Sequence, residues 1–146
     1  MRAAPAAALV VLALAVPAGA AEFRSVGSEP GVLYDAPSTK ARKLYVVSRD
    51  YPLEVVVRVQ GWTKVRDAEG GINWIEDRLL TDRRTVMVKA ARAEVRQAAE
   101  DGAPAAFVAE QGVVLELVEP AASGWARVRH RDGASGFVRI TQVWGL

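Results

Sequence analysis

The segment GWTKVR at residues 61–66 constrains the fold most, because a close copy, GWARVR, follows 63 residues later at 124–129. Before this segment the two halves align with a shift of 62, which carries Leu33 to Val95 and Leu53 to Leu115. One residue inserted within 119–123 raises the shift to 63, so that Trp74 meets Phe137. Self-similarity of this kind predicts two copies of one structural unit.

The repeat divides the chain near residues 81–84, which form a polar run between the two patterned blocks. We therefore expect one domain at 22–82 and a second at 83–146. Units of about 60 residues are near the lower limit at which a lone core is sufficient. The boundary also lacks the Gly, Ser or Pro run of a flexible linker. Two copies fixed side by side are expected.

Hydrophobic periodicity predicts short strands in each copy. In residues 53–60 (LEVVVRVQ) the apolar side chains alternate, which assigns Leu53, Val55, Val57 and Val59 to one half-buried face. Gly61 and the glycines of 67–71 mark the turns to the strands at 62–66 and 72–75. Two further strands are predicted at 32–34 and 44–47, with a loop containing Pro37 between them. Residues 76–80 (EDRLL) are too short for an isolated α-helix, so we expect a 3₁₀ turn closing the barrel.

The order of a strand, a Pro-Ser loop, Gly-Trp-x-x-Val, a Gly turn and an aromatic-aliphatic pair resembles the bacterial SH3-like (SH3b) domain. The residues that carry the resemblance are 35–38 (DAPS), 61–65 (GWTKV), 70–71 (GG), 74–75 (WI), 124–128 (GWARV) and 136–138 (GFV). It implies an all-β fold of two tandem SH3-like small β-barrels, built from short antiparallel strands with 3₁₀ turns. It also implies export, and either binding of peptidoglycan peptides or an adaptor role.

Two positions depart from the pattern of the resemblance. Asn73 stands where the second copy has Gly136, and Ala99 and Glu100 replace the Pro-Ser pair of the first loop. The second replacement bears on the conformation of the loop.

The first 20 residues differ in kind from the rest. A basic Arg2, an uncharged run at 6–16 and the small residues 18–20 (AGA) follow the order of a secretory signal peptide, with cleavage expected after Ala20. The apolar run is shorter than the roughly 20 residues of a membrane anchor. We expect an exported chain, periplasmic or secreted, with no stable transmembrane segment after cleavage.

The residue inventory predicts no catalysis and no cofactor. Cysteine is absent, which excludes disulfides, thiolate nucleophiles and zinc held by sulfur. His130 is the only histidine, and with Ser135 it falls in an expected hairpin turn, where a solvated side chain is the simpler interpretation. One histidine and scattered carboxylates give no closed set of metal ligands. Once Arg2 is removed, 18 Lys and Arg face 17 Asp and Glu, so no bulk attraction to nucleic acid is expected.

Strand parity indicates where a ligand would bind. Trp62, Lys64 and Arg66 share one face, while Thr63 and Val65 share the other, which is expected to be the core. We hypothesise a groove for an extended peptide in the first copy, with a counterpart in the second. The groove residues are Tyr34, Trp62, Lys64, Arg66 and Trp74, and the counterparts are Trp125, Arg127, Arg129 and Phe137.

The alternative is that the tryptophan rings cover the barrel or lie between the copies, and that the basic side chains are only solvated. The first copy is the better groove candidate, because the second has Arg96 in place of Tyr34 and Phe137 in place of Trp74. Trp144 is expected to close the second barrel, and an interface role is the alternative. Two partners are consistent with these patterns: a peptidoglycan peptide, or an envelope protein that contributes an extended segment.

Overall fold

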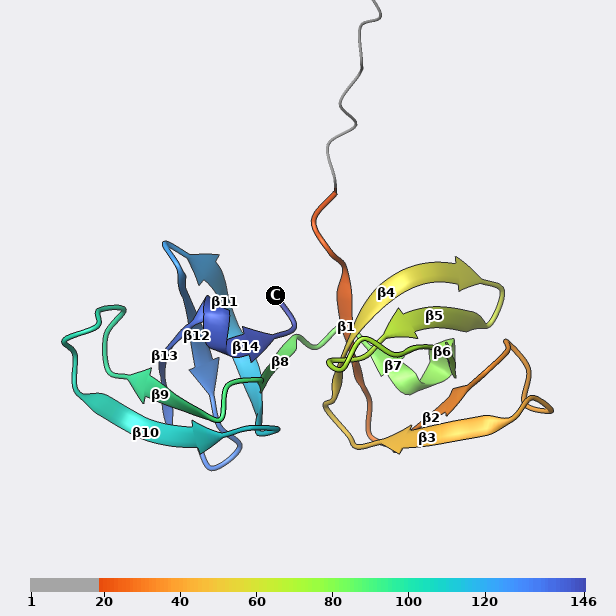
Figure 1. Cartoon of the computed structure of the whole chain (residues 1–146), viewed down its shortest axis with the longest axis horizontal. Helices are drawn as coiled ribbons and strands as arrows, with labels where there is room; N and C mark the ends of the chain where they lie inside the picture. The colour runs from red at the N-terminus through yellow and green to blue at the C-terminus, as the bar shows by residue number, and fades with distance from the viewer. Residues whose placement is uncertain (1–18) are drawn as a thin grey trace, which may run out of the picture.

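The computed structural model describes residues 19–146, and the predicted signal peptide at 1–20 lies almost wholly outside them. The described chain forms two antiparallel sheets of seven strands each. The two sheets lie side by side in Figure 1, with β1 and β8 near the junction between them. The strands of the first sheet are β1 (Phe23–Val26), β2 (Gly31–Tyr34), β3 (Lys43–Val47), β4 (Pro52–Val59), β5 (Trp62–Arg66), β6 (Ile72–Glu76) and β7 (Leu80–Thr81). Those of the second are β8 (Thr85–Val88), β9 (Arg92–Arg96), β10 (Ala105–Glu110), β11 (Val114–Ala122), β12 (Trp125–Arg129), β13 (Ser135–Arg139) and β14 (Val143–Trp144).

The two sheets have the same strand order, β3-β2-β6-β5-β4-β1-β7 and β10-β9-β13-β12-β11-β8-β14. A 3₁₀ turn precedes the last strand of each sheet, η1 (Asp77–Leu79) in the first and η2 (Ile140–Gln142) in the second. The predicted all-β fold and the predicted 3₁₀ turn are therefore confirmed. We call strands β1–β7 the first repeat and strands β8–β14 the second repeat.

The register repeats as closely as the topology. Lys64 lies opposite Trp74 in the first repeat, and Arg127 lies opposite Phe137 in the second. Both central hairpins contain a β-bulge at the same place, between Val55 and Val57 and between Leu117 and Glu119. The inserted residue falls between Glu119 and Ala122, in the long β11 strand. The alignment deduced from sequence is thus also an alignment of hydrogen-bonded pairs.

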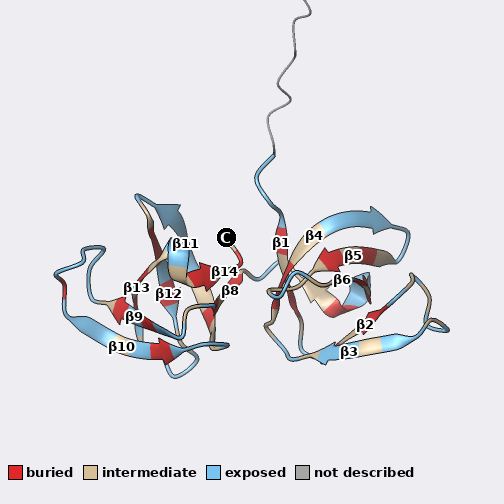
Figure 2. Cartoon of the chain, in the orientation of Figure 1, coloured by how far each residue is buried: buried red, intermediate tan, exposed pale blue. Residues whose placement is uncertain are grey.

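Each repeat has its own apolar core. The first is formed by Val26, Leu33, Leu53, Val65, Ile75 and Leu79. The second is formed by Val86, Val88, Ala93, Val95, Ala109, Leu115, Ala126, Val128, Val138 and Val143. In Figure 2 the buried residues gather toward the inside of each repeat, while β10 and the far half of β4 are mostly exposed. Small aliphatic side chains fill both cores, which suits strands as short and as curved as these.

The half-buried face predicted for residues 53–60 is wrong beyond its first residues. Leu53 is fully buried and Val55 is partly buried, but Val57 and Val59 remain 46% and 44% exposed. The β-bulge between Val55 and Val57 breaks the alternation of the side chains, and β4 then continues past the barrel as part of a hairpin.

The 35–42 loop and its counterpart have the same backbone hydrogen bonds despite different sequences. The Ser38 N–H donates to the Ala36 carbonyl at 2.8 Å, and the Glu100 N–H donates to the Ala98 carbonyl at 2.8 Å. The loop ends are tied equivalently as well, by Asp35 to Arg42 and by Gln97 to Pro104. Replacement of the Pro-Ser pair therefore leaves the turn conformation intact.

The repeats contact one another through side chains that sequence analysis did not place there. Phe23 of β1 meets Trp144 of β14 edge to face, with ring centroids 5.2 Å apart. The Thr85 hydroxyl donates to the Asp50 carbonyl at 2.6 Å across the same junction. The Trp144 ring packs on the first repeat, which matches the alternative of an interface role rather than the expectation that it closes the second barrel. The two repeats are fixed side by side, as their small size predicted.

Candidate functional site

The parity prediction for β5 agrees with the observed burial. Thr63 and Val65 are fully buried, whereas Trp62, Lys64 and Arg66 are partly exposed. Strand β5 therefore presents its Trp-Lys-Arg face outward, and both tryptophans of the first repeat keep accessible surface.

The proposed groove residues of the first repeat lie together, but Tyr34 is a packing residue. Its ring is only 4% exposed and meets Trp62 edge to face at a centroid distance of 5.3 Å. Trp74 lies opposite Tyr34 and beneath Lys64, whose Nζ is 5.6 Å from the Trp74 ring centroid. Arg66 is paired with Glu54 at 2.8 Å. Trp62 and Trp74 are thus the aromatic residues of this surface that keep accessible area.

The counterpart residues in the second repeat are arranged differently. Trp125 is 6% exposed, because the Arg139 guanidinium lies 4.2 Å from its ring centroid. Arg127 and Arg129 are exposed on β12 and pair with Glu119 at 2.6 Å and with Glu116 at 3.0 Å. Arg127 also lies 6.0 Å from the Phe137 ring, as Lys64 does near Trp74.

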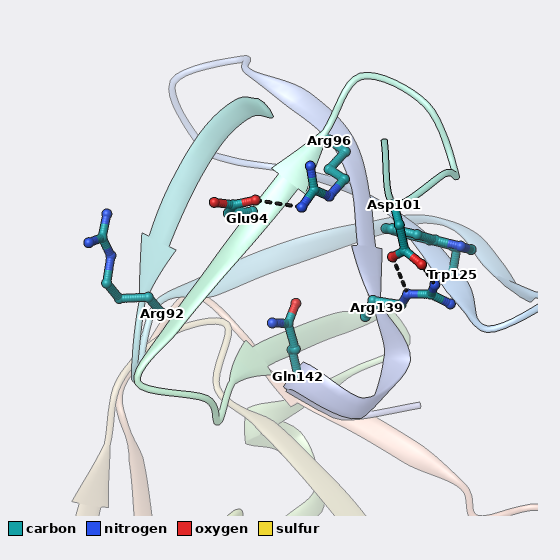
Figure 3. Close-up of a pocket in the computed structure, with 7 residues that line it drawn as sticks. All are labelled: Arg92, Glu94, Arg96, Asp101, Trp125, Arg139 and Gln142. Atoms are coloured by element: carbon teal, nitrogen blue, oxygen red, sulfur yellow. Dashed lines mark hydrogen bonds and ion pairs between the residues drawn. The ribbon is translucent and has the colours of Figure 1, made fainter. Parts of the chain in front are cut away.

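A cavity of about 430 Å³ opens beside Trp125, and we call it the Trp125 pocket. Figure 3 shows its walls converging from β9, the 97–104 loop, β12, β13 and η2. The lining side chains are Arg92, Glu94, Arg96, Asp101, Trp125, Arg139 and Gln142. An aromatic ring and three arginines therefore line one small cavity, with Arg92 at its edge, where the side chain extends away from Trp125 (Figure 3).

The Trp125 pocket is lined by side chains that differ from their counterparts in the first repeat. Arg96 corresponds to Tyr34, Arg139 to Glu76, and Gln142 to the buried Leu79. In the first repeat the Tyr34 ring fills the space beside its tryptophan. Sequence analysis noted Arg96 in place of Tyr34 and counted it against the second repeat. The same replacement, together with Arg139 and Gln142, lines the pocket there.

Gly136 sets the position of Arg96 in the pocket wall. A Cβ atom on Gly136 would lie 2.4 Å from the Arg96 carbonyl oxygen, so the strands approach more closely here than any side chain allows. The sequence already indicated this close approach, because Gly136 stands in the second copy where the first has Asn73.

Two of the three pocket arginines already have carboxylate partners. Arg96 pairs with Glu94 at 2.6 Å and also donates to the Ala103 carbonyl at 2.8 Å. The Arg139 Nε donates to Asp101 at 3.1 Å. Arg92 forms no ion pair with any residue in 19–146. The pocket therefore has a surplus of positive charge and guanidinium donors in fixed orientations, which suits a ligand carboxylate.

His130 lies in the β12–β13 turn, as the sequence predicted, whereas Ser135 is the first residue of β13 and lies opposite Arg129. The His130 Nδ1 lies 3.1 Å from Asp132, and the His130 ring tilts against Phe107. The hydrogen bond from the Ala134 N–H holds the pKa of Asp132 below its usual range, and the contact with His130 adds to this. His130 therefore makes the contacts of a turn residue, with Asp132 and Phe107.

Between residues 19 and 146 no three His, Asp or Glu side chains are grouped so that they could hold a metal ion. Over the same residues no helix has the length and hydropathy needed to cross a bilayer.

Comparison with known families gives one clear match. The family model described as the bacterial SH3 domain matches residues 27–82 and, again, residues 89–145. No curated protein matches the chain significantly.

Two solved structures share a distant likeness, at 13% and 14% sequence identity and a TM-score of 0.40 each. They are the structures of NlpC2 and NlpC1 from Trichomonas vaginalis, and they align with 86% and 98% of this chain. The chain spans 48% and 52% of their lengths.

Proposed function

We propose that this chain, which belongs to the bacterial SH3 domain family and contains two such domains in tandem, is a non-catalytic module of the bacterial cell envelope. In this proposal the module binds peptidoglycan peptides. The Trp125 pocket is the primary site in this proposal. The first-repeat surface around Trp62 and Trp74 is a second contact region.

The observation that carries the proposal is the difference between the two repeats at equivalent positions. Tyr34 closes the space beside Trp62, whereas Arg96 leaves the space beside Trp125 open. An open cavity lined by arginines, one of which lies on a tryptophan ring, has the general form of a site for a small amphipathic ligand.

Peptidoglycan stem peptides have the chemistry that this pocket would bind. They are short and extended, and they combine small aliphatic side chains with free carboxylates. Guanidinium groups bind carboxylates by paired hydrogen bonds, and Arg92 is the pocket arginine without a carboxylate partner in the described chain. Arg96 and Arg139 would exchange part of their contact with Glu94 and Asp101 for the ligand carboxylate.

The test is titration of the purified protein with a synthetic stem peptide by isothermal calorimetry, and sedimentation with purified sacculi. The substitution Arg96→Tyr gives the second repeat the residue that fills the first. We expect it to weaken binding about tenfold or more, since it removes a donor and occupies the cavity. Arg139→Gln should weaken binding through loss of charge.

The matched control is Arg58→Gln, because Arg58 also pairs with one carboxylate, Glu22 at 2.7 Å, but lies outside the pocket. It should bind like the wild type. Absence of binding by the wild-type protein to both stem peptide and sacculi at low salt would refute the proposed function. Equal losses in Arg58→Gln and Arg139→Gln would exclude the Trp125 pocket as the site.

A further inference from the structure

A second cavity, of about 720 Å³, lies between the two repeats, and we call it the inter-repeat cleft. Its walls come from residues 48–50 of the first repeat and from 112–114 and 129–131 of the second. The hydrogen bond from Thr85 to the Asp50 carbonyl closes its base, and the Thr85 side chain is buried. The cleft therefore depends on both repeats and on the way in which they are fixed together.

The inter-repeat cleft has an excess of positive charge. Four arginines line it, against two carboxylates, Asp50 and Glu116. The arginines are Arg49, Arg83, Arg129 and Arg131. The acidic and basic residues of the whole chain nearly balance, at 17 Asp and Glu against 19 Lys and Arg.

The two inner arginines of the cleft, Arg83 and Arg129, already bind carboxylate groups. Arg83 bridges the repeats, with one nitrogen 3.3 Å from Asp50 and another 3.4 Å from Glu116. Arg129 meets the same Glu116 oxygen at 3.0 Å. Carboxylates that belong to the chain thus already occupy the inner guanidinium groups.

The outer arginines are available to a ligand. Arg131 forms no ion pair within residues 19–146, and Arg49 has only a 3.7 Å contact with Asp50. Both are exposed, one on each repeat. A carboxylate-bearing segment in the cleft would therefore find one weakly paired guanidinium on each side.

Asp50 has a backbone conformation that is unusual for its residue type. Its φ is +67°, in the left-handed region, and its N–H donates to the Val26 carbonyl at 2.9 Å. Left-handed backbone is costly for residues other than glycine, although Asp tolerates it better than most, and it concentrates at ligand sites. Here it holds the Asp50 carboxylate between Arg49 and Arg83.

We propose that the inter-repeat cleft is a binding site for an acidic peptide segment of a partner protein, with ligand carboxylates on Arg49 and Arg131. Val113 and Val114 line the cleft beside the arginines, so that aliphatic parts of a peptide also find a contact. A phosphate group, by contrast, would contact only the arginines and would leave the two valines without a partner. The site shares no lining residue with the Trp125 pocket, so each can be tested separately.

The experiment uses a fluorescein-labelled hexaglutamate peptide and measures fluorescence anisotropy with the purified protein at low ionic strength. The double variant Arg49→Glu/Arg131→Glu should weaken binding about tenfold or more, because both outer donors become repulsive. The control is Lys40→Glu/Lys89→Glu, which changes the net charge equally at two exposed lysines outside both cavities. It should change binding less than about twofold.

A second measurement is independent of whether the double variant folds. Hexaglutamate should shift the amide resonances of Gly112 and Gly133 in the wild-type protein and leave that of Gln142 unchanged. The proposal is overturned if wild-type protein does not bind hexaglutamate, or if both double variants lose binding equally. Binding of phosphatidylglycerol vesicles without binding of hexaglutamate would also overturn it, in favour of a phosphate ligand. None of these outcomes depends on binding of stem peptide at the Trp125 pocket.

Discussion

The Arg139 guanidinium lies on the Trp125 ring, 4.2 Å from its centroid, while its Nε donates to Asp101 at 3.1 Å. One side chain therefore covers the ring and also ties β13 to the 97–104 loop. The first repeat has Glu76 at this position, opposite Trp62. This difference makes Arg139 a structural residue as well as a candidate ligand contact.

Arg139→Gln should lower the free energy of unfolding by about 1 kcal/mol, because a cation–π contact of a partly exposed arginine contributes roughly this much. Urea denaturation measures the loss. The control is Arg127→Gln, whose guanidinium lies 6.0 Å from the Phe137 ring and pairs with the exposed Glu119. Its cost should stay below about 0.5 kcal/mol. If Arg127→Gln lowered the free energy of unfolding as much as Arg139→Gln does, the closer contact of Arg139 with its ring would not be the cause of the loss.

Gly136→Ala should destabilise the second repeat by about 1–3 kcal/mol, because the new Cβ would lie 2.4 Å from the Arg96 carbonyl oxygen and 2.9 Å from Val95. Both contacts belong to strand β9, so the strand must shift and Arg96 must shift with it. Thermal unfolding and stem-peptide titration would both detect the change.

The matched control for Gly136→Ala is Asn73→Ala in the first repeat, since Asn73 lies opposite Val65 as Gly136 lies opposite Val128. A side chain is already accommodated there, so we expect a smaller loss of stability. Equal losses for the two variants would mean that the close approach of β13 and β9 is not the cause.

Trp144→Ala should uncouple the two repeats. The Trp144 ring packs edge to face on the buried Phe23 ring of the first repeat, so its removal opens the junction. We expect a loss of about 2–4 kcal/mol and, in calorimetry, two thermal transitions in place of one. The control is Trp62→Ala, which removes a ring packed within the first repeat and should preserve a single transition. A single transition in Trp144→Ala would contradict coupling through this contact.

The sequence predicted those parts of the fold that depend on repetition and alternation. The shift of 62 and then 63 reproduces the strand pairs, including Lys64 with Trp74 and Arg127 with Phe137. Alternation also identified Thr63 and Val65 as inward-facing. It could not predict the exposure of Val57 and Val59, because a β-bulge changes side-chain parity without a distinctive residue.

The two cavities depend on contacts that periodicity does not encode. The Trp125 pocket needs Arg96 together with Arg139 and Gln142, which follow it by more than 40 positions and meet it only through strand order. The inter-repeat cleft is lined by both repeats, which are joined there by the hydrogen bond from Thr85 to Asp50, two residues 35 positions apart. Short strands such as β1 and β8 were also missed individually, because four residues give too little periodicity to distinguish a strand from a loop.

Glu116 predicts how stability at the inter-repeat cleft changes with pH. Its hydrogen bond with Arg129, supported by the charge of Arg83, holds the pKa of the Glu116 carboxyl below its usual range. A lowered folded-state pKa means that the unfolded chain takes up the proton first. The stabilisation is therefore present above the ordinary glutamate pKa of about 4.3 and is lost as pH falls through the lower folded-state value.

Glu116→Gln should accordingly reduce stability at neutral pH and flatten its decline toward acid. Urea denaturation of both proteins between about pH 7 and about pH 3 measures the two curves, which should converge at the acidic end because protonated Glu116 resembles glutamine. Glu119→Gln is the control, because Glu119 is more exposed and pairs with a single arginine, Arg127. It should leave the shape of the curve nearly unchanged. If the Glu116→Gln curve ran parallel to that of the wild type down to the lowest pH, Glu116 would not be the source of the acid sensitivity, and the bridge from Arg83 to Glu116 would not stabilise the junction between the repeats.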